Sequence, residues 1–182
     1  MSEKRSSQKG LTLIELLIAM IVGAMIAGAV VASMFQLFTV SDRNSDYAAA
    51  FTQVQNAGYW VSHDAVQAQE VWDEDDPGAP VVGFLILEWV DWGGDAHRIV
   101  YTLEDASGGL KELKRTTYSF DENGDPQLEE TIVVAQYIQY IDNDPTITSS
   151  IWGEGVLTLK ITAQVGDQTV KRTYKVEPRP LS

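Results

Sequence analysis

Residues 11–40 read LTLIELLIAMIVGAMIAGAVVASMFQLFTV, and this apolar stretch decides how the chain is organised. From Leu16 to Val40 it contains 25 residues, none of them charged and none a proline. As a helix rising ~1.5 Å per residue, such a segment spans about 37 Å, which exceeds the ~30 Å hydrocarbon core of a bilayer. The stretch therefore predicts a membrane-spanning helix over residues 11–40.

The ten residues before this helix, MSEKRSSQKG, are polar, with three basic side chains against one acidic one. The chain as a whole has 26 acidic and 13 basic residues among its 182, a net charge of −13. Because basic flanks stay in the cytoplasm, we expect a single-pass protein of the cytoplasmic (inner) membrane with its bulk outside the cytoplasm. The acidic balance makes nucleic acid an unlikely partner.

Glu15 is the one charged residue within residues 11–40. An ordinary signal anchor explains the apolar run, and a cleaved secretory signal would use the small residues Val30, Val31 and Ala32 before Ser33. Neither explains a carboxylate in an apolar segment, which costs ~2.5–3.5 kcal/mol on insertion scales and usually has a partner and a function.

The segment GLTLIEL, residues 10–16, resembles the processing motif of type IV pilins and type II secretion pseudopilins. The resemblance implies that a prepilin peptidase removes residues 1–10 by cutting between Gly10 and Leu11 and methylates the new amine. It also implies that the Leu11 amine of one subunit pairs with Glu15 of a neighbour in the filament core. The family usually begins with phenylalanine, whereas this chain has Leu11.

The rest of the chain predicts an α+β fold in which the hydrophobic helix continues into an antiparallel β-sheet head packed on its second half. Residues 41–72 form the continuing helix, since apolar and small side chains recur every three or four residues from Tyr47 to Trp72. Residues 73–182 form the head. Its expected strands are Val81–Val90, Arg98–Glu104, Lys111–Phe120, Leu128–Ile141 with a possible break near Ala135, Val156–Ala163 and Thr169–Val176, with a loop over Asp142–Ser150.

The whole chain looks most like the J-type minor pseudopilins and related minor pilins. The similarity rests on Gln53–Gln69, on Lys111–Arg115 with Ile132–Tyr140, and on Val176–Arg179, although His63 replaces an arginine usual in such heads. It implies a place at or near the filament tip. The expected partners are the peptidase, other pilin or pseudopilin subunits, the inner-membrane assembly machinery and, before assembly, lipid. A filament-displayed adhesin or DNA-uptake binding module is the alternative.

Enzyme chemistry finds little support. The chain has no cysteine, and only His63 and His97 could serve as base for Ser107, which follows Asp105 and Ala106 without the glycine of a nucleophile loop. No phosphate-binding loop, dinucleotide motif or zinc spacing occurs. We therefore expect a non-enzymatic subunit without a cofactor.

Two further features of the sequence are candidate binding sites. Asp121, Asn123 and Asp125 alternate as calcium ligands do, but Pro126 stands in place of the loop glycine and no acidic residue occupies the twelfth position. A hairpin turn is the simpler interpretation, and the same holds for a solvated acidic run at Asp73–Asp76. Trp92, in a predicted turn and followed in the sequence by two glycines, is a candidate interface residue.

Overall fold

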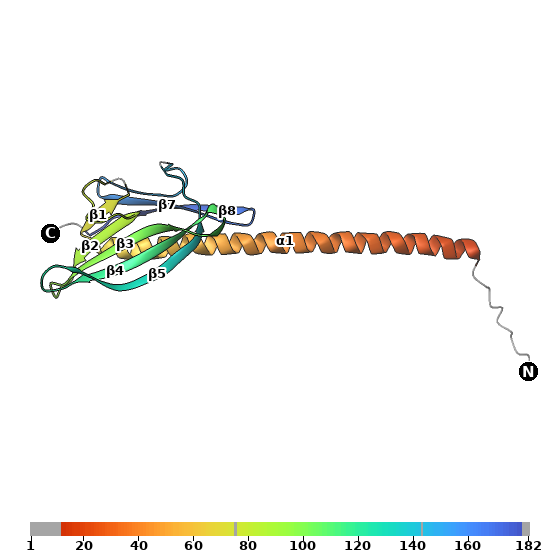
Figure 1. The fold of residues 1–182 in the computed structure, drawn as a ribbon. Coiled ribbons are helices and arrows are strands. Elements are labelled where there is room, and N and C mark those ends of the chain that lie inside the picture. The colour runs from red at the N-terminus through yellow and green to blue at the C-terminus, as the bar shows by residue number, and fades with distance from the viewer. Residues whose placement is uncertain (1–11, 75, 143, 180–182) are drawn as a thin grey trace, which may run out of the picture. The chain divides into compact units, whose positions relative to one another are not determined.

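The computed structural model describes residues 12–74, 76–142 and 144–179. One α-helix is followed by strands and a short 3-10 turn, and the chain divides into two compact units, Met1–Asp42 and Arg43–Ser182. The elements are α1 (Leu13–Gln67), β1 (Glu70–Asp73), β2 (Leu85–Val90), β3 (Ala96–Asp105), η1 (Ser107–Gly109), β4 (Lys111–Phe120), β5 (Pro126–Ile138), β6 (Ser149–Gly153), β7 (Val156–Val165) and β8 (Gln168–Val176) (Figure 1).

The first unit contributes the apolar part of α1. Every described side chain from Thr12 to Ser45 is exposed. Among the described residues, α1 is the one helix long and apolar enough to cross a membrane, with a mean hydropathy of 2.5 in its most apolar window. The apolar residues of this segment surround the helix and do not form a stripe, which is the pattern of a helix solvated by lipid or by other helices.

The second unit, here called the head, is an eight-stranded antiparallel sheet in the order β1-β2-β3-β4-β5-β7-β6, with β8 paired to the other side of β7 (Figure 1). The sheet opens between β5 and β7, which pair only at Ile138 and Ala163. Its far ends come close together, because the backbone N–H of Trp152 in β6 donates to Asp73 Oδ2 in β1 at 2.7 Å. The sheet thus curls around a core.

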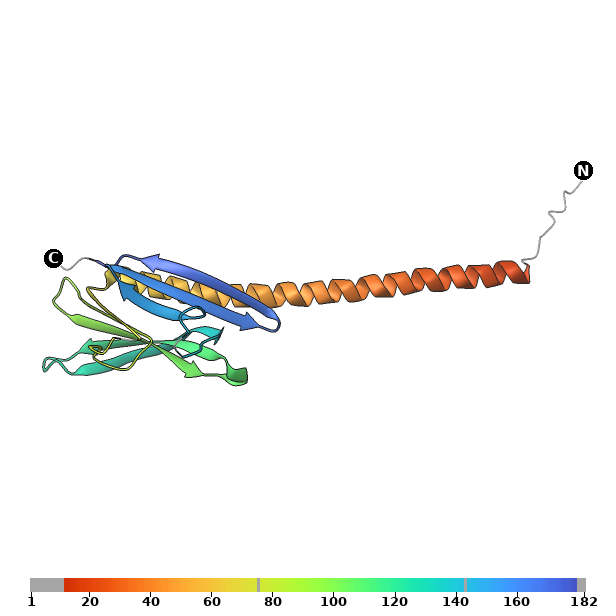
Figure 2. The ribbon, with the colours of Figure 1, turned by 90° about the horizontal axis from the view of Figure 1, so that it is seen from above.

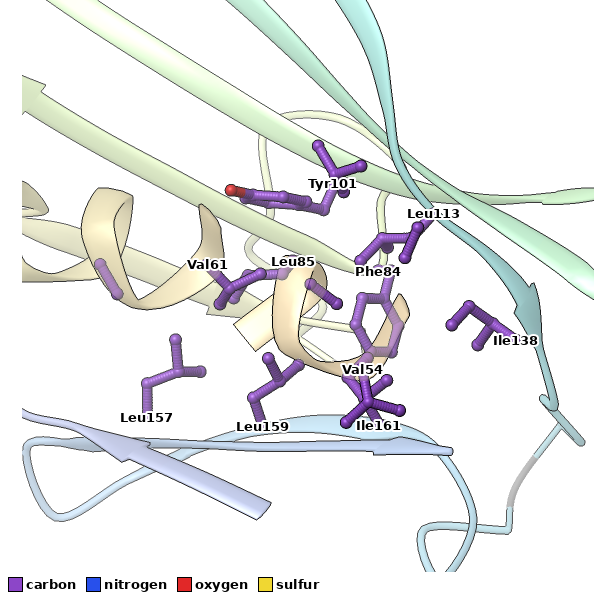
Figure 3. Close-up of a cluster of buried hydrophobic side chains, with 14 of the residues drawn as sticks. Val54, Val61, Phe84, Leu85, Tyr101, Leu113, Ile138, Leu157, Leu159 and Ile161 are labelled. Carbon is purple, nitrogen blue, oxygen red and sulfur yellow. The ribbon is translucent and has the colours of Figure 1, made fainter. Parts of the chain in front are cut away.

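The C-terminal part of α1 fills that core. Figure 2 shows β7 and β8 running beside this part of the helix together with β6, which pairs with β7, and the green strands β3, β4 and β5 forming a second layer. In Figure 3, Val54 and Val61 lie between Tyr101 and Leu85 on one side and Leu157, Leu159 and Ile161 on the other. All of these side chains are fully buried. The α+β fold predicted from the sequence is confirmed.

Several boundaries differ from the prediction. The helix ends at Gln67 and not at Trp72, because the chain turns there and Gln69 N–H donates to Glu88 O, which starts the pairing of β1 with β2. Trp72 therefore lies in a strand that the sequence did not predict. The expected loop 142–150 ends in β6, and Tyr47, at the start of the stripe, is half exposed.

The predicted break near Ala135 is a shift in register. Leu113 pairs with Ala135 but Lys114 pairs with Val133, so Val134 is an extra residue in β5. The strand continues to Ile138 rather than Ile141, with Tyr137 at a positive φ of 59° just before it. The bulge and this turn of the backbone bend β5 toward its single point of pairing with β7.

Candidate functional site

The start of α1 is built by Thr12 and Glu15. Glu15 Oε2 accepts hydrogen bonds from the backbone N–H and the hydroxyl of Thr12, both at 2.9 Å. In return the Glu15 N–H points to Thr12 Oγ1 at 3.4 Å. This reciprocal arrangement is a capping box, in which both residues satisfy N–H groups that have no partner inside the helix. The Thr-x-x-Glu spacing of residues 12–15 is the sequence signal for this capping box.

The capping box occupies only one oxygen of the Glu15 carboxylate. Oε1 accepts no hydrogen bond from any described residue, and the side chain is exposed. Gly10 and Leu11, predicted as the cleavage and methylation positions, lie outside the described residues. Glu15 is thus a carboxylate with a free oxygen, close to the predicted new N-terminus and at the head of an exposed apolar surface.

That apolar surface extends along α1 from Leu13 to Val40. Its large hydrophobic side chains are at least half exposed, with rare exceptions such as Val22 at 49%. Soluble monomers do not present continuous apolar surfaces of this size, so the segment needs lipid or other subunits around it. This requirement fits the predicted membrane and filament-core helix of residues 11–40.

A second polar cluster lies inside the head, where Asp64 on α1 is 1% exposed. Arg115 of β4 approaches its carboxylate with two nitrogens, Nε at 2.7 Å from Oδ2 and Nη2 at 3.1 Å from Oδ1. The hydroxyl of Tyr101, on β3, donates to Oδ2 at 2.5 Å. A buried carboxylate, a two-point guanidinium and a phenol therefore join the helix to two adjacent strands.

The surroundings of this cluster keep Arg115 in place. Its guanidinium lies 5.1 Å from the centre of the Trp60 ring, and Nη1 donates to Thr117 Oγ1 at 2.8 Å. Burial tends to lower the pKa of Arg115, but Asp64 outweighs it and raises that pKa, so the guanidinium stays charged. Burial and then the charge of Asp64 raise the pKa of Tyr101 far above its ordinary value, so the phenol stays protonated.

The sequence did not identify this cluster. Asp64 stands next to His63, whose Nδ1 lies 3.3 Å from Asp64 Oδ1, while its two partners in the sheet are 37 and 51 residues away in the sequence. The cluster has a structural role, because its buried polar atoms are all hydrogen-bonded within the protein and it lies in the core. Its hydrogen bonds hold the C-terminal part of α1 against β3 and β4.

Trp92 lies at the β2–β3 turn and is 93% exposed, as predicted. The guanidinium of Arg179 lies 5.0 Å from the centre of its ring. The turn itself is held by Asp91, whose Oδ1 accepts from the backbone N–H groups of Gly93 and Asp95. Bonding to Asp95 in particular lowers the pKa of Asp91. The exposure is therefore fixed by a defined turn, and a role of Trp92 in an interface remains a prediction.

The acidic β4–β5 turn has the geometry of a hairpin. Asp121 Oδ1 accepts from the backbone N–H groups of Asn123 and Asp125, both at 2.9 Å. These bonds, that to Asp125 first, lower the pKa of Asp121. The described part of the chain contains no group of three or more side chains of the metal-binding types placed to hold an ion. Calcium at Asp121, Asn123 and Asp125 therefore gains no geometric support.

The residues considered for hydrolysis do not come together. His63 lines a groove of about 520 Å³ on the outer side of α1, with Tyr59 and Tyr174. Ser107 lines a separate pocket of about 300 Å³, with Asp105 and Glu112. His97 stacks on Trp89 in a third place. Ser107, the serine predicted as a nucleophile, therefore has neither histidine among the residues that line its pocket.

Residues 5–31 match the family described as the prokaryotic N-terminal methylation motif. Comparison of the chain with curated proteins and with solved structures found no match. The motif implies processing by a prepilin peptidase and assembly with other pilins in general. Together, the methylation motif and the long exposed apolar helix support a type IV pilin-like or pseudopilin-like structural subunit, anchored in a membrane, rather than an enzyme.

Proposed function

We propose that the protein is a minor pilin or pseudopilin that is cut between Gly10 and Leu11 and joins a type IV pilus or type II secretion pseudopilus at or near its tip. The observation that carries this proposal is a methylation motif placed directly on an exposed apolar helix whose first turns hold a single carboxylate. The J-type resemblance of the head supports the minor position in the filament.

Assembly depends on the charge of Glu15. Moving α1 from lipid into a filament core leaves Glu15 in an apolar environment, and the new Leu11 amine carries the opposite charge into the same environment. An isolated ion in such surroundings costs several kcal/mol, whereas a close pair offsets much of that cost. The free Oε1 of Glu15 can accept the ammonium of a neighbour while Oε2 keeps the helix capped.

Before assembly, the subunit crosses the inner membrane once, with residues 1–10 in the cytoplasm and the head outside. The basic leader and acidic head support this orientation. The inner-membrane assembly machinery then extracts α1 from lipid. The apolar surface of residues 13–40 needs an environment without water both in the membrane and in the filament. Lipid tails and neighbouring apolar helices exclude water equally well.

Three variants separate the charge of Glu15 from its capping role. Glu15→Gln keeps a side chain that suits the capping box but removes the charge, Glu15→Ala removes both, and Thr12→Ala removes the cap but keeps the charge. In the native host, we expect Glu15→Gln and Glu15→Ala each to lower incorporation into filaments by about tenfold or more, because the Leu11 ammonium stays unpaired. Thr12→Ala should assemble.

Mass spectrometry of the same material checks processing independently. All three variants should begin with methylated Leu11, since none changes Gly10. Normal incorporation of Glu15→Gln contradicts the pairing mechanism, and a failure of Thr12→Ala equal to that of Glu15→Gln shows that the cap is what matters. An N-terminus at any other residue contradicts the proposed function itself.

A further inference from the structure

The charges of the head are distributed unevenly. Residues 43–155 contain 21 acidic and five basic side chains, whereas residues 156–179, which form the β7–β8 hairpin and its tail, contain two acidic and five basic ones. A strongly acidic head therefore carries one basic element. The five cations are Lys160, Lys171, Arg172, Lys175 and Arg179.

These five cations form no ion pair with a described carboxylate, although the charge of Lys171 adds to the Thr146 hydrogen bonds that lower the pKa of Asp144. Elsewhere in the head, four basic side chains form ion pairs with carboxylates, as Lys111 does with Asp105 at 2.7 Å. No described carboxylate forms an ion pair with any of the five. Instead, Lys160 and Lys171 donate to backbone carbonyls of the loop before β6, and Arg172 lies over the ring of Phe51. Apart from the interaction of Lys171 with Asp144, no described carboxylate balances their charge.

Strand β8 places this charge at an edge of the sheet. It pairs with β7 along its whole length and with no other strand among the described residues. Lys171, Arg172, Thr173 and Lys175 on it are exposed. The N–H and C=O groups on its outer side are thus open to a further strand.

A complementary acidic edge exists where the sheet opens. The side of β5 that faces away from β4 pairs with β7 only at Ile138, and closer to the turn it meets no other described strand. Residues 121–131 are all exposed and include five carboxylates and no cation. Two of them, Glu129 and Glu130, lie on β5 itself, next to Leu128, which is 64% exposed.

We propose that the heads of two copies of this chain join edge to edge, with the basic β8 of one copy against the acidic β5 of the next. Opposite charges across such a contact favour it, and like charges disfavour β8–β8 and β5–β5 pairing. Lysines on an edge strand usually serve to block pairing with other chains. Here the lysines would repel a second β8 but attract an acidic strand, so the same side chains determine which edge can pair.

The two edges differ, so the contact is head-to-tail. A head-to-tail contact leaves each end of the assembly free to continue, which produces a ring or an open helical array and not a closed dimer. The contact involves only the head, so it does not depend on the pairing of Glu15 with Leu11. It adds to the proposed filament subunit a defined surface for lateral association.

The natural absence of cysteine makes cross-linking a direct test. The full chain would carry Leu128→Cys on β5 and Thr173→Cys on β8, two exposed positions without charge. Membranes containing this double variant would be treated with a short bismaleimide. We expect a ladder of dimers, trimers and longer species on a denaturing gel, whereas each single-cysteine chain stays monomeric.

A matched control places the second cysteine at Ile151 instead of Thr173. Ile151 is 42% exposed and lies on β6, which has no part in the proposed contact. Leu128→Cys with Ile151→Cys should give no ladder. Adding Lys171→Glu and Lys175→Glu to the test pair should lower the cross-linked fraction by roughly fivefold. Adding Glu129→Lys and Glu130→Lys to that chain should restore it, because the charges are then exchanged.

Several results would overturn the proposal. The double variant could give no ladder, or Thr173→Cys alone could give a dimer. The Ile151 control could give a ladder as strong as the test pair, or the charge reversals could leave the cross-linked fraction unchanged. The N-terminal mass of the same samples reports separately on processing. A missing ladder with correctly processed protein therefore refutes the edge contact and leaves the proposed filament subunit standing.

Discussion

Asp64 shows how one residue can tie two elements together. Its carboxylate accepts from Arg115 and from Tyr101, which come from neighbouring strands, while its own backbone belongs to α1. A buried charge is costly unless it is paired and fully bonded, and here both conditions are met. Removing Arg115 would therefore leave an uncompensated carboxylate in the core, whereas removing the Tyr101 hydroxyl would take away one hydrogen bond and keep the ion pair.

We therefore expect Asp64→Asn to lower the free energy of unfolding by about 3–5 kcal/mol, because Arg115 loses its buried counterion. Urea unfolding followed by tryptophan fluorescence measures the change. The matched control is Asp105→Asn, which breaks the pair with Lys111 at a carboxylate that is 90% exposed. It should cost about 0–1 kcal/mol, as exposed pairs do. Equal losses in the two variants would contradict the structural role given to Asp64.

Gly58 is a second residue with a specific task. A Cβ built on it would lie 2.1 Å from Cζ of Tyr174, whose hydroxyl donates to Val54 O at 3.1 Å. Gly58→Ala should therefore push the Tyr174 ring aside and cost about 1–3 kcal/mol, despite the better helix propensity of alanine. Thermal unfolding measures this loss.

Two comparisons make the Gly58 result specific. Gly153→Ala, where an added Cβ meets nothing within 4 Å, should have little effect. In a chain that already carries Tyr174→Leu, the Gly58→Ala change should cost less, because the ring that it collides with is absent. An undiminished cost in that background would show that the close approach to Tyr174 is not the cause.

At the scale of elements, the sequence predicts strands well wherever turn residues bracket an apolar run. Lys111–Phe120 was predicted with both ends correct, and the helix stripe at Val54, Val61 and Ala65 is buried as expected. The two missed strands, β1 and β6, are four and five residues long and show no clear alternation of apolar and polar residues. They exist because β2 and β7 offer them partners, which no local signal reveals.

Tyr101, on β3, makes the free energy of unfolding depend on pH in the alkaline range. Its pKa is raised above the ordinary value of 10.0 by burial and by Asp64. Above pH 10 the unfolded chain therefore loses a proton that the folded chain keeps, and stability falls as the pH rises, by up to about 1.4 kcal/mol per pH unit. Below pH 10 both states hold the proton, and this contribution does not vary.

Urea unfolding at a series of pH values from 9 to 11 tests the prediction. Tyr101→Phe removes the titrating group, so its stability should decline less steeply than that of the natural chain over the same range. Tyr174→Phe is the comparison, because Tyr174 is only partly buried and its pKa is raised by burial alone. Identical slopes for Tyr101→Phe and the natural chain would contradict the raised pKa.

At the scale of the molecule, the buried hydrophobic residues of the described part of the chain all lie between Ala50 and Val176. The free energy of folding therefore resides in the second unit, Arg43–Ser182. We expect that fragment to unfold with the same urea midpoint and the same dependence on urea as the head of the full chain in detergent micelles, since the surface exposed on unfolding is the same. A lower midpoint for the fragment would show that residues before Arg43 contribute to the head.

The candidate sites differ in how far sequence predicts them. Glu15 can be found from local information, because it is the one charged residue in the largely apolar segment 11–40. The Asp64 cluster and the two unlike sheet edges cannot, since each depends on strand order. Lys175 and Glu130 are 45 residues apart, and the free sides of their strands follow from strand order: β5 pairs with β7 at only one position, and β8 pairs with β7 alone among the described strands.

The anchoring of α1 through Asp64 also has a mechanical consequence. In the filament subunit proposed above, tension along α1 would pass to the sheet in part through the bonds of Asp64 to Tyr101 and Arg115. Because both bonds connect the helix to the middle of a sheet, they are strained together in shear and do not open one after the other. The head should thus resist extraction of its stem more strongly than its modest core alone would allow.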